Sequence, residues 1–333
     1  MSEVDVKKIK KYQKLTENLK KELSKVVVGQ NKVIDSFIRA LFTRAHVLVE
    51  GVPGIAKTLL LRSLAVVVGC GFKRVQFTVD LLPTDITGVT AYTKEKGFYV
   101  VKGPVFTNFL LADEINRAPP KTQSALLEAM QERQVTIGRE TFPITKPFFV
   151  MATQNPIESA GTYELPEAQI DRFLFKVLVK YPSLSEEKVI IDQNIDVKPL
   201  EAYGLKPITN AKEIIEAQEF TKTIFLSEKI KTYITKIVDS TRNPKKYGIK
   251  LGEYIEYGAS PRASIGLALA ARAEALIKGE SFVKPQHIKN IMHEVLRHRI
   301  ILSYEGMAKK ISTDDIINEI LKKIPVMQTR KEL

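Results

Sequence analysis

Cysteine is almost absent from the chain. Cys70 is the single one among 333 residues, so no intramolecular disulfide framework can form. It stands beside apolar residues, and we interpret it as an inert buried thiol. No apolar run approaches the ~18 residues of a membrane-spanning helix, and the lysine-rich first 25 residues lack the apolar segment of a signal peptide. We therefore expect a cytoplasmic protein without a membrane partner.

Metal-ligand clusters and blocks of like charge are missing as well. The four histidines form no metal-binding constellation, since even His293 and His298 are five positions apart, and we interpret them as structural. The net charge of +13 permits nucleic-acid binding. However, the lysines are scattered, no five like charges are adjacent, and aromatic residues are not interleaved with them. We favour a solvated lysine-rich surface over a nucleic-acid interface.

Short, continuous apolar runs alternate with helical patterns in the first half of the chain. The runs lie at residues 46–49, 75–79, 109–112, 148–153 and 173–179. Helical stretches at 58–68 and 124–132 lie between some of them. An unbroken apolar run is typical of a strand that is buried on both faces of a parallel sheet. The order predicts a doubly wound α/β domain that ends near Tyr181.

Two stretches interrupt this alternation. Residues 89–101 and 134–144 each contain two short β-like runs around a turn that includes a glycine, Gly97 in the first and Gly138 in the second. Each stretch predicts a β-hairpin that projects from the core.

The two ends of the chain show helical patterns. Leucines recur every four positions within residues 1–25, which predicts an exposed amphipathic helix. From about residue 211 onward only helical patterns appear, with helix starts at Ser260-Pro261 and Pro285 and a cap at Thr313.

These patterns divide the chain into four parts. Ser183 and Glu186 have capping-box spacing and begin a helix after the α/β domain. The predicted parts are an N-terminal helix (1–25), an α/β core (26–182), linker helices (183–220) and a small all-α domain (221–333).

Residues 51–58 read GVPGIAKT between a predicted strand and a predicted helix, the context of a phosphate-binding loop. Its glycines let backbone N–H groups approach phosphate oxygens, and the helix start adds its positive end. Lys57 is expected to reach the β- and γ-phosphates and Thr58 to bind Mg²⁺. Ala56 replaces an expected glycine, which a residue that is already helical tolerates. The predicted ATP-binding residues here are Gly51, Pro53, Gly54, Ile55, Ala56, Lys57, Thr58 and Leu59.

An acid pair follows the apolar run at 109–112. Ligands of open parallel sheets bind beyond the carboxyl ends of the strands, so this pair and the phosphate loop are expected to meet. Asp113 is placed to bind Mg²⁺, and Glu114 to orient and polarise the attacking water. A later run ends in Asn155, whose amide is suited to contact that water or the γ-phosphate. Alone, either motif has a plain alternative, a Gly-Pro turn or a strand that ends in solvated acids.

Further ordered motifs accompany these two. They are DEINRAPP at 113–120, EAMQE at 128–132, ATQNP at 152–156, LPEAQIDRF at 165–173, GASPRA at 258–263 and VLRHR at 295–299. Together with the phosphate loop they resemble the MoxR family of AAA+ ATPases over residues 20–325. The resemblance implies an AAA+ α/β core with a parallel sheet, followed by a small helical lid. The hairpins at 89–101 and 134–144 resemble the helix-2 and pre-sensor-1 inserts of this clade.

The resemblance also implies roles for individual residues. Asn155 matches sensor 1, and Arg172 matches the arginine finger that acts on a neighbouring subunit's nucleotide. Arg262 matches sensor 2, and Gly29 lies in the segment that packs near the adenine. Arg262 falls in the first turn of its predicted helix, where the helix dipole disfavours a cation unless an anion is near. Whether it serves its own or a neighbouring nucleotide stays open.

The resemblance implies an ATP- and Mg²⁺-dependent motor that acts as a homo-oligomeric ring, expected to be a hexamer. It would remodel or chaperone partner proteins during maturation or cofactor insertion, with a von Willebrand factor A-domain protein as partner. The alternative is a nucleic-acid translocase, because the pre-sensor hairpin serves related helicases. Here that hairpin has one clear cation at its tip, Arg139, beside Glu140. A third possibility is a nucleotide-binding switch that hardly hydrolyses.

Overall fold

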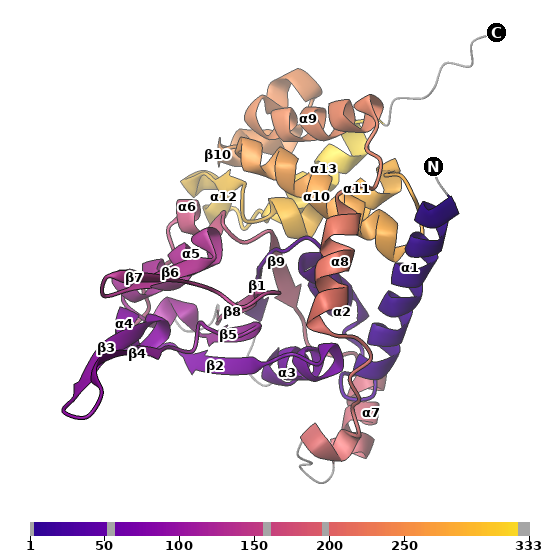
Figure 1. The fold of residues 1–333 in the computed structure, drawn as a ribbon. Helices are drawn as coiled ribbons and strands as arrows, with labels where there is room; N and C mark the ends of the chain where they lie inside the picture. Colours follow the sequence, from indigo (N-terminus) through magenta and orange to yellow (C-terminus); the bar gives the residue numbers. More distant parts are fainter. Residues whose placement is uncertain (1–2, 52–56, 156–160, 195–199, 326–333) are drawn as a thin grey trace. The chain divides into compact units, whose positions relative to one another are not determined.

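The computed structural model describes residues 3–51, 57–155, 161–194 and 200–325 (Figure 1). The chain forms two compact units: Lys14–Gln218, and Met1–Gln13 together with Glu219–Leu333. The first is the α/β unit and the second is the helical unit. Among the described residues, no helix is long and apolar enough to cross a membrane.

A five-stranded sheet forms the centre of the α/β unit. Its order is β2 (Phe72–Gln76), β5 (Phe109–Asp113), β8 (Phe149–Gln154), β1 (Val47–Gly51) and β9 (Phe175–Val179). All neighbouring strands are parallel. Residues 109–112, 149–153 and 47–49 are buried throughout, because helical crossovers cover both faces of such a sheet. The prediction of a parallel α/β core is confirmed.

The position of β2 differs from the prediction. The apolar run at 75–79 predicts a strand there, but β2 begins at Phe72 and pairs through Gln76 with Asp113. β2 is an edge strand with exposed Lys73 and Arg74, so it has no continuous apolar run to reveal it. The correction matters because it brings Arg74 and Gln76 beside the acid pair.

Further helical segments belong to the α/β unit. They are α2 (Asn31–Phe42), α3 (Lys57–Val68), α4 (Pro83–Thr87), η1 (Ile115–Arg117), α5 (Pro120–Glu132), α6 (Glu167–Ile170), α7 (Leu184–Asn194) and η2 (Leu200–Tyr203). Apolar residues of α5 pack with Leu110, Val150 and other sheet residues in one buried cluster. The capping box at Ser183 is formed, since its backbone N–H donates to the Glu186 carboxylate over 2.7 Å.

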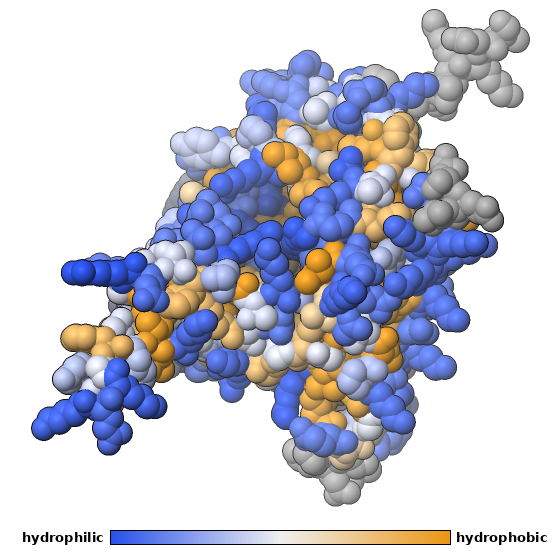
Figure 2. All heavy atoms as spheres, in the orientation of Figure 1, coloured by the Kyte–Doolittle hydropathy of each residue, from blue (hydrophilic) through white to orange (hydrophobic). Residues whose placement is uncertain are grey.

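Two antiparallel hairpins project from the α/β unit, as predicted (Figure 1). One consists of β3 (Gly88–Thr93) and β4 (Gly97–Lys102), the other of β6 (Gln134–Ile137) and β7 (Glu140–Pro143). The β3–β4 hairpin keeps large apolar side chains in solvent, with Tyr92 62% and Phe98 79% exposed. Figure 2 shows apolar surface among polar residues on this projection.

The helical unit contains α9 (Glu228–Arg242), η3 (Pro244–Tyr247), η4 (Lys250–Tyr254), α10 (Pro261–Ile277), α11 (Pro285–Leu296), α12 (Tyr304–Ala308) and α13 (Thr313–Lys323). The helix starts at Pro261 and Pro285 are confirmed. The cap of the last helix is Ser312 rather than Thr313, because the Ser312 hydroxyl accepts the Asp315 N–H in a capping box. Two short strands, β10 (Ile255–Tyr257) and β11 (Ile301–Leu302), also pair here; they are too short to show a period in the sequence.

Two helices contribute residues to both units, α1 (Glu3–Leu23) and α8 (Ala211–Thr221). The predicted N-terminal helix is present. Its leucines, Leu15, Leu19 and Leu23, are buried. The expectation of an exposed helix is therefore wrong for the face that carries these leucines. An apolar stripe of this kind gains stability by leaving water, and the helix therefore packs along it.

His46 precedes β1 and is buried. Its Nδ1 accepts the backbone N–H of Val150 over 3.0 Å. Burial, assisted by the nearby charge of Arg133, lowers the pKa of this imidazole to about 3, against a smaller opposing effect of a hydrogen bond to the Met130 backbone. The structure thus gives His46 the structural role predicted for it.

This geometry predicts a pH-dependent loss of stability. Because the folded pKa of His46 lies below its unfolded value of about 6.5, the contribution is complete above that pH. As the pH falls toward 3 it declines by about 1.4 kcal/mol per unit. His46→Asn keeps an acceptor for Val150 but does not titrate. Denaturant unfolding at pH 6.5 and 5 should show about 2 kcal/mol less pH dependence in the variant. Equal pH dependence would contradict the assignment.

Candidate functional site

The carboxyl ends of neighbouring parallel strands form the candidate site. β1 ends at Gly51, β5 at Asp113 and β8 at Gln154, and the parallel registers place these ends along one edge of the sheet. The predicted phosphate loop joins β1 to α3, as its motif requires. Of its predicted residues, Pro53, Gly54, Ile55 and Ala56 lie outside the described residues.

Lys57 begins α3 and turns back toward the strand. Its Nζ donates to the Gly51 carbonyl over 2.5 Å. Desolvation lowers the pKa of this half-buried ammonium group, while the carboxylates of Asp113, Glu114 and Glu50 oppose the shift. The lysine therefore lies within the electrostatic reach of the acid pair. Thr58 and Leu59 follow in the first turn of α3 and are partly buried.

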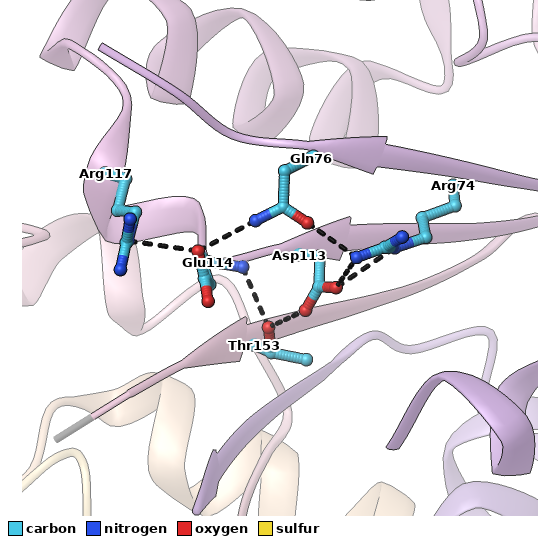
Figure 3. A network of polar contacts seen from close by, with 6 residues as sticks. All are labelled: Arg74, Gln76, Asp113, Glu114, Arg117 and Thr153. Carbon is cyan, nitrogen blue, oxygen red and sulfur yellow. Dashed lines mark hydrogen bonds and ion pairs between the residues drawn. The ribbon is translucent and has the colours of Figure 1, made fainter. Parts of the chain in front are cut away.

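Asp113 is the last residue of β5, and hydrogen bonds hold both of its carboxylate oxygens (Figure 3). Arg74 donates to Oδ2 from Nε over 3.1 Å and from its terminal nitrogen over 2.7 Å. The Thr153 hydroxyl donates to Oδ1 over 2.6 Å. These contacts hold the Asp113 carboxylate in one orientation.

Glu114 adopts a left-handed backbone conformation, with φ 56° and ψ 49°. This region costs an L-residue about 1–2 kcal/mol, and such strain gathers at functional sites. Its backbone N–H donates to the Thr153 hydroxyl over 2.8 Å. Its Oε2 accepts from Gln76 Nε2 over 2.8 Å and lies 3.0 Å from Arg117 Nε. The left-handed turn thus directs the Glu114 carboxylate toward Gln76 and Arg117, whereas Asp113 contacts Arg74 and Thr153.

One polar network connects these residues (Figure 3). Besides its bonds to Asp113, Arg74 donates to Gln76 Oε1 over 2.7 Å, and Gln76 continues to Glu114. Two guanidinium groups therefore flank the two carboxylates and reduce their mutual repulsion. Sequence reasoning missed Arg74, Gln76, Arg117 and Thr153. One signal was available, since Arg74 and Gln76 are two positions apart and share a face of β2.

The remaining predicted residues are more dispersed. Asn155 is buried directly after β8, and Arg172 is partly buried in the turn between α6 and β9, where its N–H donates to Gln169. Gly29 has a φ of +75° and lies so close to Glu186 that a Cβ would clash with that side chain. Arg262 lies in the first turn of α10, within the helical unit.

Comparison with known proteins identifies the chain's relatives. The model of the ATPase family associated with various cellular activities (AAA) matches residues 46–175, and that of the AAA lid domain matches 251–320. Chaperone MoxR1 of Mycobacterium tuberculosis is 47% identical, over 92% of this chain and 81% of its own. Protein MoxR of Methylorubrum extorquens is 31% identical, over 92% and 93%. The chain belongs to the MoxR family of AAA ATPases.

Structural comparison agrees with this family assignment. A crystal structure from Cytophaga hutchinsonii is similar with a TM-score of 0.89 and 44% sequence identity, over 97% of this chain and 98% of that one. The present chain therefore has an AAA α/β core, hairpin inserts and a C-terminal helical lid, and it is an ATPase.

Proposed function

We propose that Lys57, Thr58, Asp113 and Glu114 form the ATP-hydrolysing centre of this MoxR-family ATPase. The observation that carries the proposal is geometric: Lys57 contacts the end of β1, β5 leads into the acid pair, and the carboxyl ends of these parallel strands lie along one edge of the sheet. A half-buried ammonium group at a helix start is poorly compensated by the helix dipole and suits a phosphate. In this proposal Lys57 binds the β- and γ-phosphates together with residues 51–56 and Leu59.

The donor set fits a magnesium ion. Among the described residues, no group of three or more His, Cys, Asp or Glu side chains could hold a metal. Mg²⁺ is commonly held by one or two carboxylates together with substrate phosphates, so a larger protein cage is not needed. The Thr58 hydroxyl and the Asp113 carboxylate are hard oxygen ligands of this kind. When bound, the ion supplies positive charge that stabilises the charge developing on the phosphates.

Glu114 would then orient and polarise the attacking water. Gln76 and Arg117 hold its Oε2 in the structure, so the carboxylate has to leave or share these donors to reach the water. Asn155, buried at the end of the neighbouring strand, is suited to contact the same water or the γ-phosphate. This arrangement supports hydrolysis over a switch that only binds nucleotide.

The roles of Lys57 and Glu114 make separable predictions. Lys57→Ala should abolish binding of a fluorescent ADP analogue, because the ammonium group that reaches the phosphates is lost. Glu114→Gln should retain binding but lower turnover by at least ~100-fold, since an amide no longer polarises water as a base does. Arg62→Ala, which removes an exposed cation of the same helix, serves as control. Turnover by Glu114→Gln at the parent rate would refute the assigned role.

Assembly into a ring is the second part of the proposal. By its match to the family motif, Arg172 acts as the arginine finger on the nucleotide of the next subunit, in a ring expected to be a hexamer. Arg262 would contact a nucleotide from the lid, and Gly29 would border the adenine. Support for Arg172 comes from its place two residues after the end of α6, in the turn that leads into β9.

A finger that acts between subunits predicts complementation. Arg172→Ala should bind ATP nearly normally yet hydrolyse it ~10³-fold or more slowly, by analogy with GTPases. Turnover per subunit of the parent should rise with protein concentration. When Arg172→Ala is mixed with Lys57→Ala, an intact phosphate loop meets an intact Arg172 and activity should return. Mixed rings that form by native mass spectrometry but stay inactive would contradict a finger acting between subunits.

We further propose that the ATPase remodels or chaperones partner proteins. One supporting fact is that its relative MoxR1 is named a chaperone. Another is the exposed apolar surface of the β3–β4 hairpin, which includes Tyr92, Phe98 and Tyr99. Exposed apolar patches commonly mark protein interaction sites. Maturation or cofactor insertion, a von Willebrand factor A-domain partner and a cytoplasmic location belong to the same proposal.

A groove between the two hairpins also supports a protein client. It has a volume of about 790 Å³, and its lining includes Phe98, Val100 and Phe142 beside Lys102 and Arg139. Lys102 lies over the rings of Phe106 and Phe142, which ties its charge to the protein. Apolar contact therefore dominates over free cations here, which favours a polypeptide client over nucleic acid.

The two client classes can be separated on the β3–β4 hairpin. Phe98→Ser removes an exposed ring, whereas Lys96→Ser removes a cation from the turn of the same hairpin. With casein as an unfolded model client, we expect stimulated ATP hydrolysis that Phe98→Ser weakens and Lys96→Ser leaves intact. Single-stranded DNA should give no stimulation at physiological salt. Strong DNA stimulation that Lys96→Ser lowers would support the translocase instead.

A further inference from the structure

Thr153 occupies an unusual position between the two acids. It lies on β8, between β5 and β1, and is 1% exposed. Its hydroxyl contacts the side chain of Asp113 over 2.6 Å and the backbone nitrogen of Glu114 over 2.8 Å. Figure 3 shows this hydroxyl beneath the pair. A single buried atom therefore connects both residues that the proposed mechanism requires.

The hydrogen of this hydroxyl has one possible direction. A threonine hydroxyl carries one hydrogen and two lone pairs. The Glu114 N–H can only donate, so the hydroxyl accepts there and must direct its own hydrogen to Asp113 Oδ1. The β-branched side chain restricts the torsion that would move the hydroxyl, so the contact is fixed in the buried strand.

Two consequences follow for the acids. The Asp113 carboxylate is held on the Oδ1 side by Thr153, a buried partner, and on the Oδ2 side by Arg74, which is about half exposed. The left-handed backbone of Glu114 is held by the same hydroxyl, and that conformation decides where its side chain points. Without the hydroxyl, a partly buried N–H loses its acceptor and the strained turn loses a restraint.

We propose that Thr153 is a positioning residue that sets the geometry of Asp113 and Glu114 for hydrolysis. The inference rests on the proposed roles of those two acids. Thr153 acts through them and need not touch nucleotide. It therefore affects the chemical step and the use of Mg²⁺ more than the affinity for nucleotide.

The test compares three variants of buried threonines. Thr153→Val keeps the shape and removes the hydroxyl, and Thr153→Ser keeps the hydroxyl. Thr122→Val is the matched control, because Thr122 is also 1% exposed and its hydroxyl donates over 2.7 Å to the Leu81 carbonyl, away from the acid pair. For each we would measure kcat and KM for ATP, together with the Mg²⁺ dependence of fluorescent ATP-analogue binding and the thermal midpoint.

Thr153→Val should lower kcat by ~10–100-fold, the effect of losing one or two partly buried hydrogen bonds that orient the reacting groups. KM and analogue affinity at saturating Mg²⁺ should change less than ~3-fold, while half-maximal binding should need several-fold more Mg²⁺. Thr153→Ser should restore kcat to within ~3-fold, and Thr122→Val should resemble the parent in every catalytic measurement.

Three outcomes would overturn the inference. One is a folded Thr153→Val with parental kcat and Mg²⁺ dependence. Another is a Thr153→Ser as impaired as Thr153→Val, and the third is a Thr122→Val with the same losses. Glu114→Gln separates a failure of the Thr153 proposal from a failure of the proposed ATP-hydrolysing centre. If it is inactive while Thr153→Val is fully active, the positioning role fails and the proposed centre stands; if Glu114→Gln is active, the centre itself fails.

Discussion

Two adjacent carboxylates lie at the end of β5, whose first four residues are buried. Asp113 and Glu114 are held in place by donors from neighbouring strands: Arg74 and Gln76 from β2, and Thr153 from β8. Without such donors, the repulsion between the two like charges would be less well compensated. The order of the sheet, with β5 between β2 and β8, therefore determines whether this site can exist.

The sequence predicted those parts of the fold that depend on local patterns. Unbroken apolar runs located the central strands, and glycine-containing turns located both hairpins, because burial and turn chemistry act over a few residues. The start of β2 was wrong, since an edge strand with Lys73 and Arg74 in solvent lacks an apolar run. Ser312 was missed as a cap for a simpler reason, because Thr313 beside it is also a common capping residue type.

The candidate site shows the same division. Lys57, Asp113 and Glu114 belong to contiguous motifs, and the structure brings them within electrostatic reach of one another. Gln76 was not assigned a role, and neither was Thr153, although it lies within the motif at 152–156. Their importance arises from pairing between strands that are far apart in the chain. Their registers depend on the whole sheet rather than on any local segment. Motif reasoning therefore found the reacting groups and missed the groups that hold them.

The contacts of Glu114 separate its backbone from its side chain. The backbone N–H is bound by Thr153, which is buried and fixed within the sheet. The carboxylate is bound by Gln76 and Arg117, which solvent reaches. A partner that solvent reaches can be exchanged for water at little cost, whereas a partner fixed within the buried strand has no such replacement. The Glu114 carboxylate can therefore exchange hydrogen-bond partners at low cost while its backbone stays in place. In the proposed mechanism this exchange is required, because the carboxylate must leave Gln76 and Arg117 to contact the attacking water.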